Sequence, residues 1–192
     1  MFSQRIDDHL ALRLITTRDA EQFYAILERD RERLAEFLPW VDTTNSVEDE
    51  RASMPLWAAF DPDKQIGCAL TLDGVIIGSI GLVHIARPER WAEIGYWIDS
   101  IWEGRGYVTA AVRELERLSF TELGLERIQI RADVANTRSR AVPERLGYTL
   151  EGILRRANLT GHGQIADHSL YSLLKPEWEA REGLGAHGRE IN

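Results

Sequence analysis

The sequence predicts a mixed α/β fold in one domain, with helices flanking a mostly antiparallel sheet. Segments in which apolar and polar residues alternate, the pattern of half-buried strands, recur along the chain. Asp73-Gly74 separates two of these segments and is a strong hairpin signal, and a long helical pattern lies between two others. We therefore expect strands at residues 10–15, 66–72, 75–85, 91–98, 127–134, 148–154 and 168–174.

Helices are predicted where capping residues bound apolar residues at helical spacing. Thr17 is expected to cap the first helix, and Ser46 with Asp49 to open the second. Gly124 and Gly147 stand where a glycine would end the third and the fourth helix. The expected helices begin after residue 17 and after residue 46, and then span residues 106–123 and 136–146.

The composition of the 192 residues, 44% hydrophobic and 28% charged, excludes a disordered chain and a coiled coil. The single Cys68 excludes an intrachain disulfide, and without a Cys/His cluster at zinc-ligand spacing no metal site is expected. Asp7 and Asp8 stand where a signal peptide is apolar, and no apolar run could span a bilayer, so we expect a cytoplasmic protein. We expect residues 1–179 to form the domain and residues 180–192 a mobile tail.

Acidic residues outnumber basic ones by 31 to 23, which gives a net charge of −8. No basic stripe interleaved with aromatic residues is present, so nucleic acid is not expected as a direct partner. The acidic balance either attracts basic substrates at long range or serves solubility alone.

A glycine-containing loop is the most informative segment. The strand at residues 91–98 runs into Gly104-x-Gly106, which opens the long helix. Glycines allow the backbone to curl so that several N–H groups converge, and the helix dipole adds positive charge there. This arrangement suits a phosphate or pyrophosphate, although a simple helix-entry turn would also explain it. The segment fits neither a Walker A loop nor a dinucleotide fingerprint.

Several spaced motifs carry a resemblance to a known family. They are Phe37-Leu38-Pro39-Trp40, Ile94-Gly95-Tyr96-Trp97-Ile98, Gly104-Arg105-Gly106-Tyr107, Asn136-Thr137-Arg138-Ser139, Leu146-Gly147-Tyr148 and Asp167-His168-Ser169-Leu170-Tyr171. Over residues 8–178 the chain resembles the GNAT superfamily of acetyl-CoA-dependent N-acyltransferases, and within it the RimJ/RimL type, named for ribosomal-protein N-terminal acetyltransferases. The resemblance implies the GNAT fold, in which two central strands splay apart.

The resemblance also implies acetyl-CoA as the cofactor. Glu103 replaces the Gln or Arg that begins the family's phosphate loop, and because a carboxylate disfavours pyrophosphate we expect Glu103 to point into solvent. Val108 replaces the last small residue of the loop. The implied phosphate ligands are Gly104, Arg105, Gly106, Tyr107, Val108 and Thr109.

The pantetheine arm is implied to lie along Tyr96, Trp97 and Ile98, whose backbone would contact it and supply an oxyanion-hole N–H. Core packing is the alternative for the side chain of Trp97. Asn136 is implied as a pantetheine ligand and Ser139 as a neighbour of the coenzyme sulfur, although both are also natural N-caps.

Pro143 stands where many relatives have a tyrosine as general acid, so that acid is absent. Because proline costs about 3 kcal/mol inside a helix, we expect this helix to start near Ser139, with Pro143 in its first turn. Ser139 is then the remaining candidate acid.

Glu93 is the candidate base, since histone acetyltransferases of the superfamily use a glutamate in the same Trp/Phe-Ala-Glu-Ile context. Apolar neighbours would desolvate its carboxylate and favour proton uptake; a solvated edge position or a salt bridge is the alternative. Trp40 and Trp57 are candidates for a substrate wall or for hydrophobic packing. The isolated histidines, His84, His162 and His168, are interpreted as strand or loop residues.

We expect an acetyltransferase that modifies a primary amine, foremost the N-terminal α-amine of a basic protein such as a ribosomal protein. A small amine such as a polyamine or aminoglycoside is one alternative acceptor, and a non-catalytic acyl-CoA-binding module is another alternative. A homodimer is expected by similarity and because exposed tryptophans would need cover.

Overall fold

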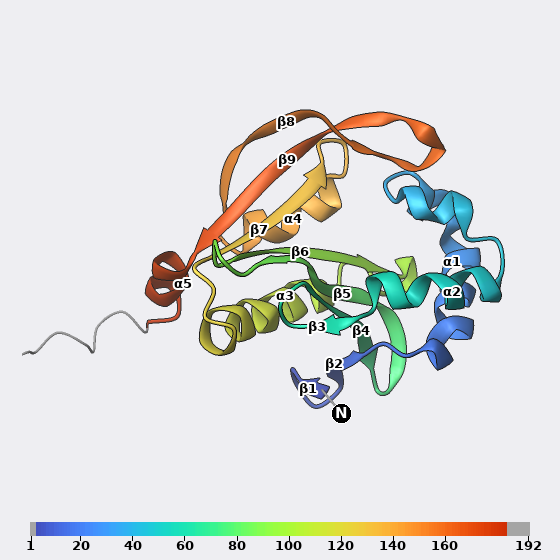
Figure 1. Cartoon of the computed structure of the whole chain (residues 1–192), viewed down its shortest axis with the longest axis horizontal. Helices are drawn as coiled ribbons and strands as arrows, with labels where there is room; N and C mark the ends of the chain where they lie inside the picture. Colours follow the sequence, from blue (N-terminus) through green and yellow to red (C-terminus); the bar gives the residue numbers. More distant parts are fainter. Residues whose placement is uncertain (1–2, 184–192) are drawn as a thin grey trace, which may run out of the picture.

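The protein is built around a nine-stranded sheet with helices on both of its faces (Figure 1). The computed structural model describes residues 3–183. The sheet has the strand order β1-β2-β4-β5-β6-β7-β9-β8, and β3 pairs with β4. The strands are β1 (Ser3–Arg5), β2 (Leu10–Leu14), β3 (Phe60–Asp61), β4 (Gln65–Leu72), β5 (Val75–Ala86), β6 (Trp91–Ile98), β7 (Arg127–Asp133), β8 (Thr149–Leu159) and β9 (Ile165–Leu174).

Helices and short helical turns (η) connect the strands. They are η1 (Thr17–Asp19), α1 (Ala20–Ala35), η2 (Pro39–Thr43), α2 (Val47–Trp57), η3 (Ser100–Trp102), α3 (Tyr107–Arg117), η4 (Leu118–Glu122), α4 (Thr137–Arg145), η5 (Gly161–Gly163) and α5 (Lys175–Arg181). The Ser46 hydroxyl accepts the Asp49 N–H at 3.0 Å, which confirms this cap. Thr16, not the predicted Thr17, caps η1, because the Asp19 carboxylate accepts the Thr16 N–H at 2.8 Å. Within residues 3–183, no helix is long and apolar enough to cross a membrane.

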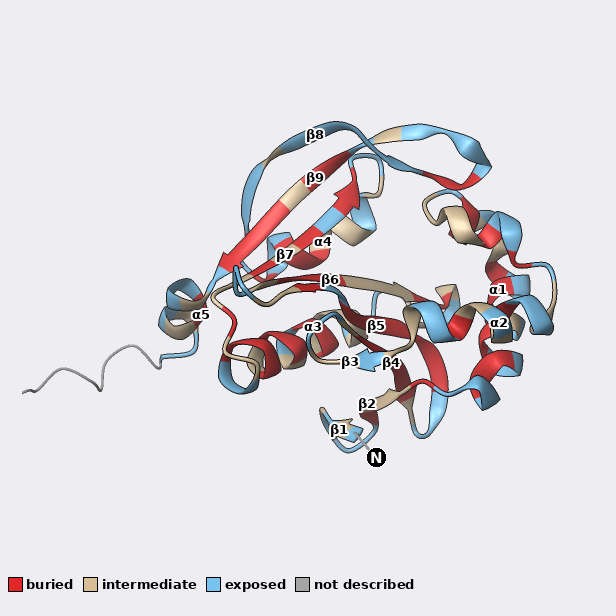
Figure 2. Ribbon diagram, viewed as in Figure 1, coloured by how far each residue is buried: buried red, intermediate tan, exposed pale blue. Residues whose placement is uncertain are grey.

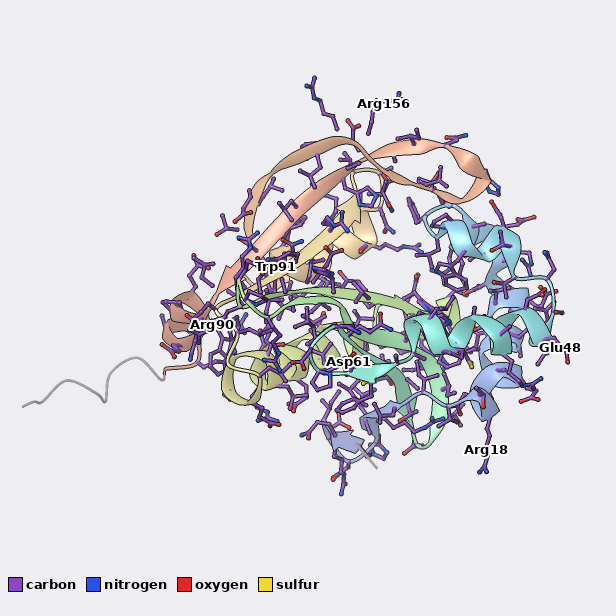
Figure 3. All side chains as sticks on the ribbon, viewed as in Figure 1. Arg18, Glu48, Asp61, Arg90, Trp91 and Arg156 are labelled. Carbon is purple, nitrogen blue, oxygen red and sulfur yellow. The ribbon has the colours of Figure 1, made fainter. Side chains whose placement is uncertain are left out.

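The two central strands separate along their length. Strands β4, β5 and β6 form the predicted antiparallel meander, with Asp73 and Gly74 at its first turn. Strand β6 then pairs in parallel with β7 only from Trp91 to Glu93. Figure 3 marks Trp91 at this paired end, and Figure 1 shows β6 and β7 diverging beyond it. The predicted splay of the GNAT fold is therefore confirmed.

The helices lie in two layers because the strands alternate their apolar residues between two faces. On β4, Cys68 and Leu70 pack in the core that contains α3, whereas Ala69 packs in the core that contains α1 and α2. Helices α3, α4 and α5 cover the first face, and the buried residues concentrate between the layers (Figure 2). Strand β8, by contrast, is exposed along almost its whole length at the edge of the sheet (Figure 2).

The end of the domain lies beyond its predicted boundary. Helix α5 runs to Arg181, so residues 180 and 181 belong to the fold and not to a tail. Trp178 packs against Phe120 with ring centroids 5.3 Å apart, and the Arg181 guanidinium donates to the Leu146 carbonyl at 2.7 Å. The rest of the predicted tail, from residue 184 onward, lies outside the described residues. Strand β8 also runs to Leu159, five residues past its predicted end.

Candidate active site

The splay leaves backbone groups of β6 without a strand partner. The Asp99 N–H donates to the Ile77 carbonyl of β5 at 2.9 Å, and antiparallel pairing alternates from there. The backbone of Trp97 consequently faces β5, whereas the backbones of Tyr96 and Ile98 face the opening. The Ile98 carbonyl accepts a hydrogen bond from Arg33 at 2.7 Å, which agrees with that direction.

A cleft of about 1280 Å³ lies at this opening, between the end of α1 and the first turns of α3 and α4. We call it the large cleft. All the residues that the resemblance implies as cofactor ligands line it: Tyr96, Trp97, Ile98, Gly104, Arg105, Gly106, Tyr107, Val108, Thr109 and Asn136.

Gly104 and Gly106 shape one wall of the large cleft through their backbone conformation. Their φ angles are 72° and 85°, in the left-handed region that side-chain-bearing residues rarely adopt. The second glycine immediately precedes α3, so the N–H groups of the first helical turn have no intrahelical acceptor. Free N–H groups and the positive end of the helix dipole therefore meet at the cleft, which is an anion-binding geometry.

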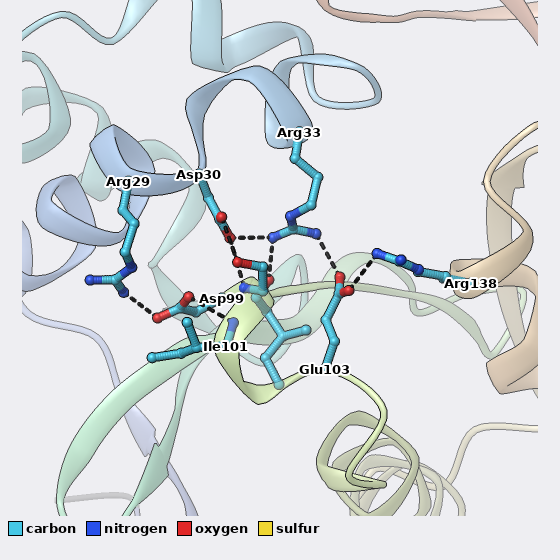
Figure 4. Close-up of polar contacts among 9 residues, drawn as sticks. Arg29, Asp30, Arg33, Asp99, Ile101, Glu103 and Arg138 are labelled. Atoms are coloured by element: carbon cyan, nitrogen blue, oxygen red, sulfur yellow. Dashed lines mark hydrogen bonds and ion pairs between the residues drawn. The ribbon is translucent and has the colours of Figure 1, made fainter.

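Glu103 is held between two arginines instead of pointing into solvent as predicted. Its carboxylate accepts from Arg33 of α1 at 2.6 Å and from Arg138 of α4 at 2.7 Å, and its side chain is only 22% exposed. Figure 4 shows the two guanidinium groups approaching from opposite sides. The ion pairs offset the cost of placing a carboxylate beside an anion site, and we call this arrangement the Glu103 clamp.

The sequence did not identify most of the positive charge of the large cleft. Besides Arg105, the cleft is lined by four arginines that lie on three helices: Arg33, Arg113, Arg138 and Arg145. The Arg145 guanidinium donates to the Thr109 hydroxyl at 3.1 Å, which ties α4 to the first turn of α3. Arginines are frequent on exposed helix faces, so only the folded chain shows that these four converge.

The tryptophans predicted at the acceptor side pack in the core instead. Trp57 makes an edge contact with Phe23 at 5.6 Å, and Trp40 lies 6.0 Å from Trp97. Trp97 also contacts Phe23 at 5.7 Å, which confirms the packing interpretation of its side chain. Neither Trp40 nor Trp57 lines the large cleft or the smaller pocket described below, so the structure favours the packing interpretation of both side chains.

Helix α4 starts at Thr137, so Pro143 lies inside the helix and not in its first turn as predicted. Asn136 is the cap, and its side-chain oxygen accepts the Ser139 N–H at 2.9 Å. Pro143 has no N–H for the Ser139 carbonyl one turn earlier. The Tyr96 hydroxyl donates to that carbonyl at 2.9 Å and replaces the missing bond. Burial, the main cause, raises the pKa of Tyr96, so the hydroxyl keeps its proton.

A second, smaller pocket of about 180 Å³ adjoins the large cleft. It shares five residues with the large cleft: Phe37, Leu38, Tyr96, Asn136 and Ser139. The remaining residues come from β6, β7, β8 and β9, among them Glu93, Arg131, Asp133, Asn158 and His168. The two cavities therefore meet where the splay begins to widen, at the start of α4. We call this second cavity the small pocket.

Glu93 lines the small pocket but is held by neighbours from β7. Arg131 Nε lies 3.0 and 2.9 Å from its two carboxylate oxygens, and Gln129 donates to one of them at 2.9 Å. The structure therefore shows a salt bridge at Glu93 and not a solvated edge carboxylate. Proton uptake by Glu93 would break this ion pair, so the carboxylate is poorly placed to act as the base.

Comparison with known proteins agrees with this geometry. A family model described as an acetyltransferase (GNAT) domain matches residues 9–149. The chain belongs to the GNAT acetyltransferase family. It is similar to the Bacillus subtilis (strain 168) protein named "Putative ribosomal N-acetyltransferase YdaF", with 38% identity over 184 residues that cover 95% of this chain and 100% of the relative.

Two solved structures extend the comparison. A crystal structure of a probable acetyltransferase has 38% sequence identity and a TM-score of 0.83, covering 93% of this chain and 99% of that one. Mycobacterium smegmatis RimJ in complex with CoA-disulfide has 26% identity and a TM-score of 0.79, covering 91% and 89%. The predicted family, its RimJ/RimL type and its acetyl-transferring activity are confirmed by these relatives.

Proposed function

We propose that this GNAT enzyme transfers the acetyl group of acetyl-CoA to the N-terminal α-amine of a protein, with a ribosomal protein as acceptor. The observation that carries the proposal is the meeting of the large cleft and the small pocket at Tyr96, Asn136 and Ser139. One cavity suits an anionic, elongated donor, and the other supplies a separate approach for an amine. A ribosomal-protein acceptor would place the reaction in the cytoplasm.

The large cleft fits coenzyme A in three respects. The loop from Gly104 to Thr109 offers backbone N–H groups for the pyrophosphate, and five arginines, two of them paired with Glu103, line the same cleft. The outward-facing backbone of Tyr96 and Ile98 offers donors and acceptors for the pantetheine amides. Asn136 uses its side-chain oxygen as a cap, and no described residue accepts from its amide nitrogen, which can donate to pantetheine.

Acetyl-CoA supplies a thioester, whose acyl carbon is open to attack by an amine and whose thiolate is a tolerable leaving group. A β6 backbone N–H that faces the opening would stabilise charge on the thioester oxygen. Ser139 lies at the meeting point of the cavities, with its hydroxyl 3.4 Å from the Tyr96 hydroxyl. In the proposed mechanism Ser139 protonates the leaving sulfur. Loss of the Ser139 hydroxyl should lower the rate less than loss of the base would.

The acceptor class follows from charge and from proton chemistry. A net charge of −8 attracts a basic protein, as ribosomal proteins are, and the relatives of RimJ/RimL type support that acceptor. A free α-amine has a pKa near 7.7–8.0, so roughly a tenth of it is neutral at pH 7. A lysine near 10.4 would cost about 4.6 kcal/mol to deprotonate. An α-amine is therefore the easier acceptor for this site.

Coenzyme A release tests the proposal. The full chain is assayed with acetyl-CoA and a panel of ribosomal-protein N-terminal peptides, polyamines and aminoglycosides. Turnover confined to the peptides is expected, and peptides with acetyl-blocked N-termini are the matched control. Preference for polyamines or aminoglycosides would contradict the acceptor. Tight acetyl-CoA binding without turnover on any amine would indicate a non-catalytic acyl-CoA-binding module.

We also propose that the enzyme is a homodimer, but the tryptophan argument for it is wrong. All six tryptophans lie within residues 3–183, and none is exposed. Five of the exposed large apolar residues instead lie together on the β8–β9 hairpin: Leu150, Ile153, Leu154, Leu159 and Ile165. Because β8 is also an unpaired edge of the sheet, a second copy is the occupant we propose for this face. Light scattering at tens of micromolar should give twice the monomer mass of 21.9 kDa. A monomeric mass would contradict it.

A further inference from the structure

His168 differs from the other described histidines in its surroundings. It lies on β9, is 8% exposed and lines the small pocket. Its Nδ1 is fully buried, and no described group is within hydrogen-bonding distance of that atom. His84, in contrast, is exposed on β5, with its ring centroid 4.9 Å from that of Trp91 and the rings tilted, while exposed His162 pairs with Asp42. A buried ring nitrogen without a partner costs free energy, which indicates a role beyond packing.

Charged groups face His168 from the neighbouring strands. Asp133 of β7 is its direct cross-strand partner, Arg131 lies two residues earlier on β7, and Glu93 reaches the same pocket from β6. Desolvation by burial, the largest effect, lowers the pKa of His168; Asp133 and Glu93 oppose this shift, and Arg131 reinforces it. The imidazole is therefore neutral near pH 7 and has a lone pair for a proton.

The other titratable side chains that line the small pocket already have roles. Glu93 is paired with Arg131 and Gln129. Tyr96 donates to the Ser139 carbonyl, and an Asp133 oxygen accepts the Ala135 N–H at 2.7 Å. Among these described residues, His168 is the neutral base with no hydrogen bond to a described residue at either ring nitrogen, and Nε2, unlike Nδ1, is not fully buried.

We propose that the small pocket receives the acceptor amine and that His168 is its general base, an inference that rests on the proposed function. The neutral amine nitrogen forms the C–N bond to the acetyl carbon, and the C–S bond breaks with its electron pair on sulfur. The nitrogen then carries one proton too many, which passes directly or through one water to the imidazole Nε2, because Nδ1 is fully buried. The thiolate takes up a proton from Ser139, which regains one from solvent, and the imidazolium releases its own, so that the charges balance.

The test compares three variants of the full chain in the coenzyme A release assay. His168→Gln should lower kcat/KM for the acceptor about 10²–10⁴-fold at pH 7, because general base catalysis contributes that much. Its KM for acetyl-CoA should stay unchanged, and the defect should shrink toward pH 9. His84→Gln, the matched control outside both cavities, should change neither parameter. Glu93→Gln should lose less than about tenfold, whereas a Glu93 base would require the full 10²–10⁴-fold loss.

Chemical rescue separates a catalytic role from a structural one. In His168→Ala, added imidazole should restore turnover in proportion to its unprotonated concentration, with no effect on His84→Ala. An unchanged pH–rate profile in His168→Gln, or a loss in His168→Ala that imidazole does not relieve, would overturn the proposal. Wild-type protein that acetylates no amine of the panel would overturn the proposed function, and the base with it. An active wild type with an unaffected His168→Gln would overturn the base alone.

Discussion

The large cleft and the small pocket are neighbours, yet they are constructed differently. Backbone groups provide much of the large cleft: the open side of β6, the glycine turn before α3 and the first turn of that helix. The small pocket consists mainly of side chains from four strands and α4, including Glu93, Asp133 and His168. A backbone site depends on a short local segment, whereas a side-chain site depends on the register of distant strands. This difference explains why the sequence predicts the large cleft but not the small pocket.

The largest effect on the large cleft is expected when a bulky residue replaces a glycine in the turn before α3. Gly106→Val forces a branched side chain into a left-handed conformation and disturbs N–H groups that we assign to the pyrophosphate. We expect the Kd for coenzyme A, measured by calorimetry, to rise about 10–100-fold, since hydrogen bonds to charged groups contribute about 1.5–3 kcal/mol.

Gly74→Val is the matched control, because Gly74 has a similar φ of 82° in a hairpin turn outside both cavities. It should lower stability without changing the Kd for coenzyme A. Equal changes in Kd for the two variants would contradict a backbone-built cofactor site.

Release of the Glu103 clamp should strengthen cofactor binding. In Glu103→Gln, Arg138 loses its carboxylate partner and Arg33 keeps only the Asp30 carboxylate, so both guanidinium groups offer more charge to phosphate. At low ionic strength we expect the Kd for coenzyme A to fall by up to about tenfold, equal to about 1.4 kcal/mol. Glu36→Gln, which changes a carboxylate of the same cleft that neither arginine contacts, should have a smaller effect. Weaker binding in Glu103→Gln would show that the clamp preorganises the cleft.

Tyr96 lines both cavities, and its hydroxyl bonds the carbonyl that Pro143 leaves without a donor. We therefore expect Tyr96 and Pro143 to be energetically coupled. Tyr96→Phe leaves the Ser139 carbonyl without a donor, and we expect it to lower the free energy of unfolding by about 1–3 kcal/mol. In a Pro143→Ala background, the new amide N–H at position 143 can bond that carbonyl, so the same substitution should cost less. Urea denaturation of the four proteins gives the coupling. An identical cost in both backgrounds would disprove the compensation.

The smallest expected effect is the pH dependence of stability at His168. Its pKa is lowered in the folded state, so below the usual pKa of about 6.5 the unfolded chain takes up a proton more readily than the folded one. Stability from this group is therefore full above that value and decreases as pH falls toward the folded-state pKa. His168→Gln should flatten this decrease in urea titrations, and His84→Gln should not. A steeper decrease in His168→Gln would reverse the sign of the argument.

The fold was largely predictable because its signals are local. The Asp73-Gly74 turn, the Ser46 cap and the alternation in β6 each depend on a few adjacent residues. Helix α5 and the distal half of β8 were missed because their sequences lack a clear period and are stabilised by packing and pairing with distant segments.

Site predictions failed where tertiary contacts decide the role of a side chain. Glu93 is paired with Arg131, and Glu103 is paired with Arg33. Each arginine lies on another element, so no spacing in the sequence reveals these ion pairs. Pro143 was misplaced because the compensating hydroxyl comes from Tyr96, 47 positions earlier in the sequence. In the sequence His168 stands isolated, because its pocket forms only when β9 pairs with β7.

A conjugate of coenzyme A with a short N-terminal peptide, joined through its α-amine, tests most directly whether the two cavities form one acetyl-transfer site. Calorimetry would compare this conjugate with coenzyme A in the wild type and in Asn158→Trp, which fills the small pocket from its exposed rim. We predict that the wild type binds the conjugate at least about tenfold more tightly, a gain of about 1.4 kcal/mol. Asn158→Trp should lose that gain and keep its affinity for coenzyme A. Equal affinities of the wild type for both ligands would contradict the account.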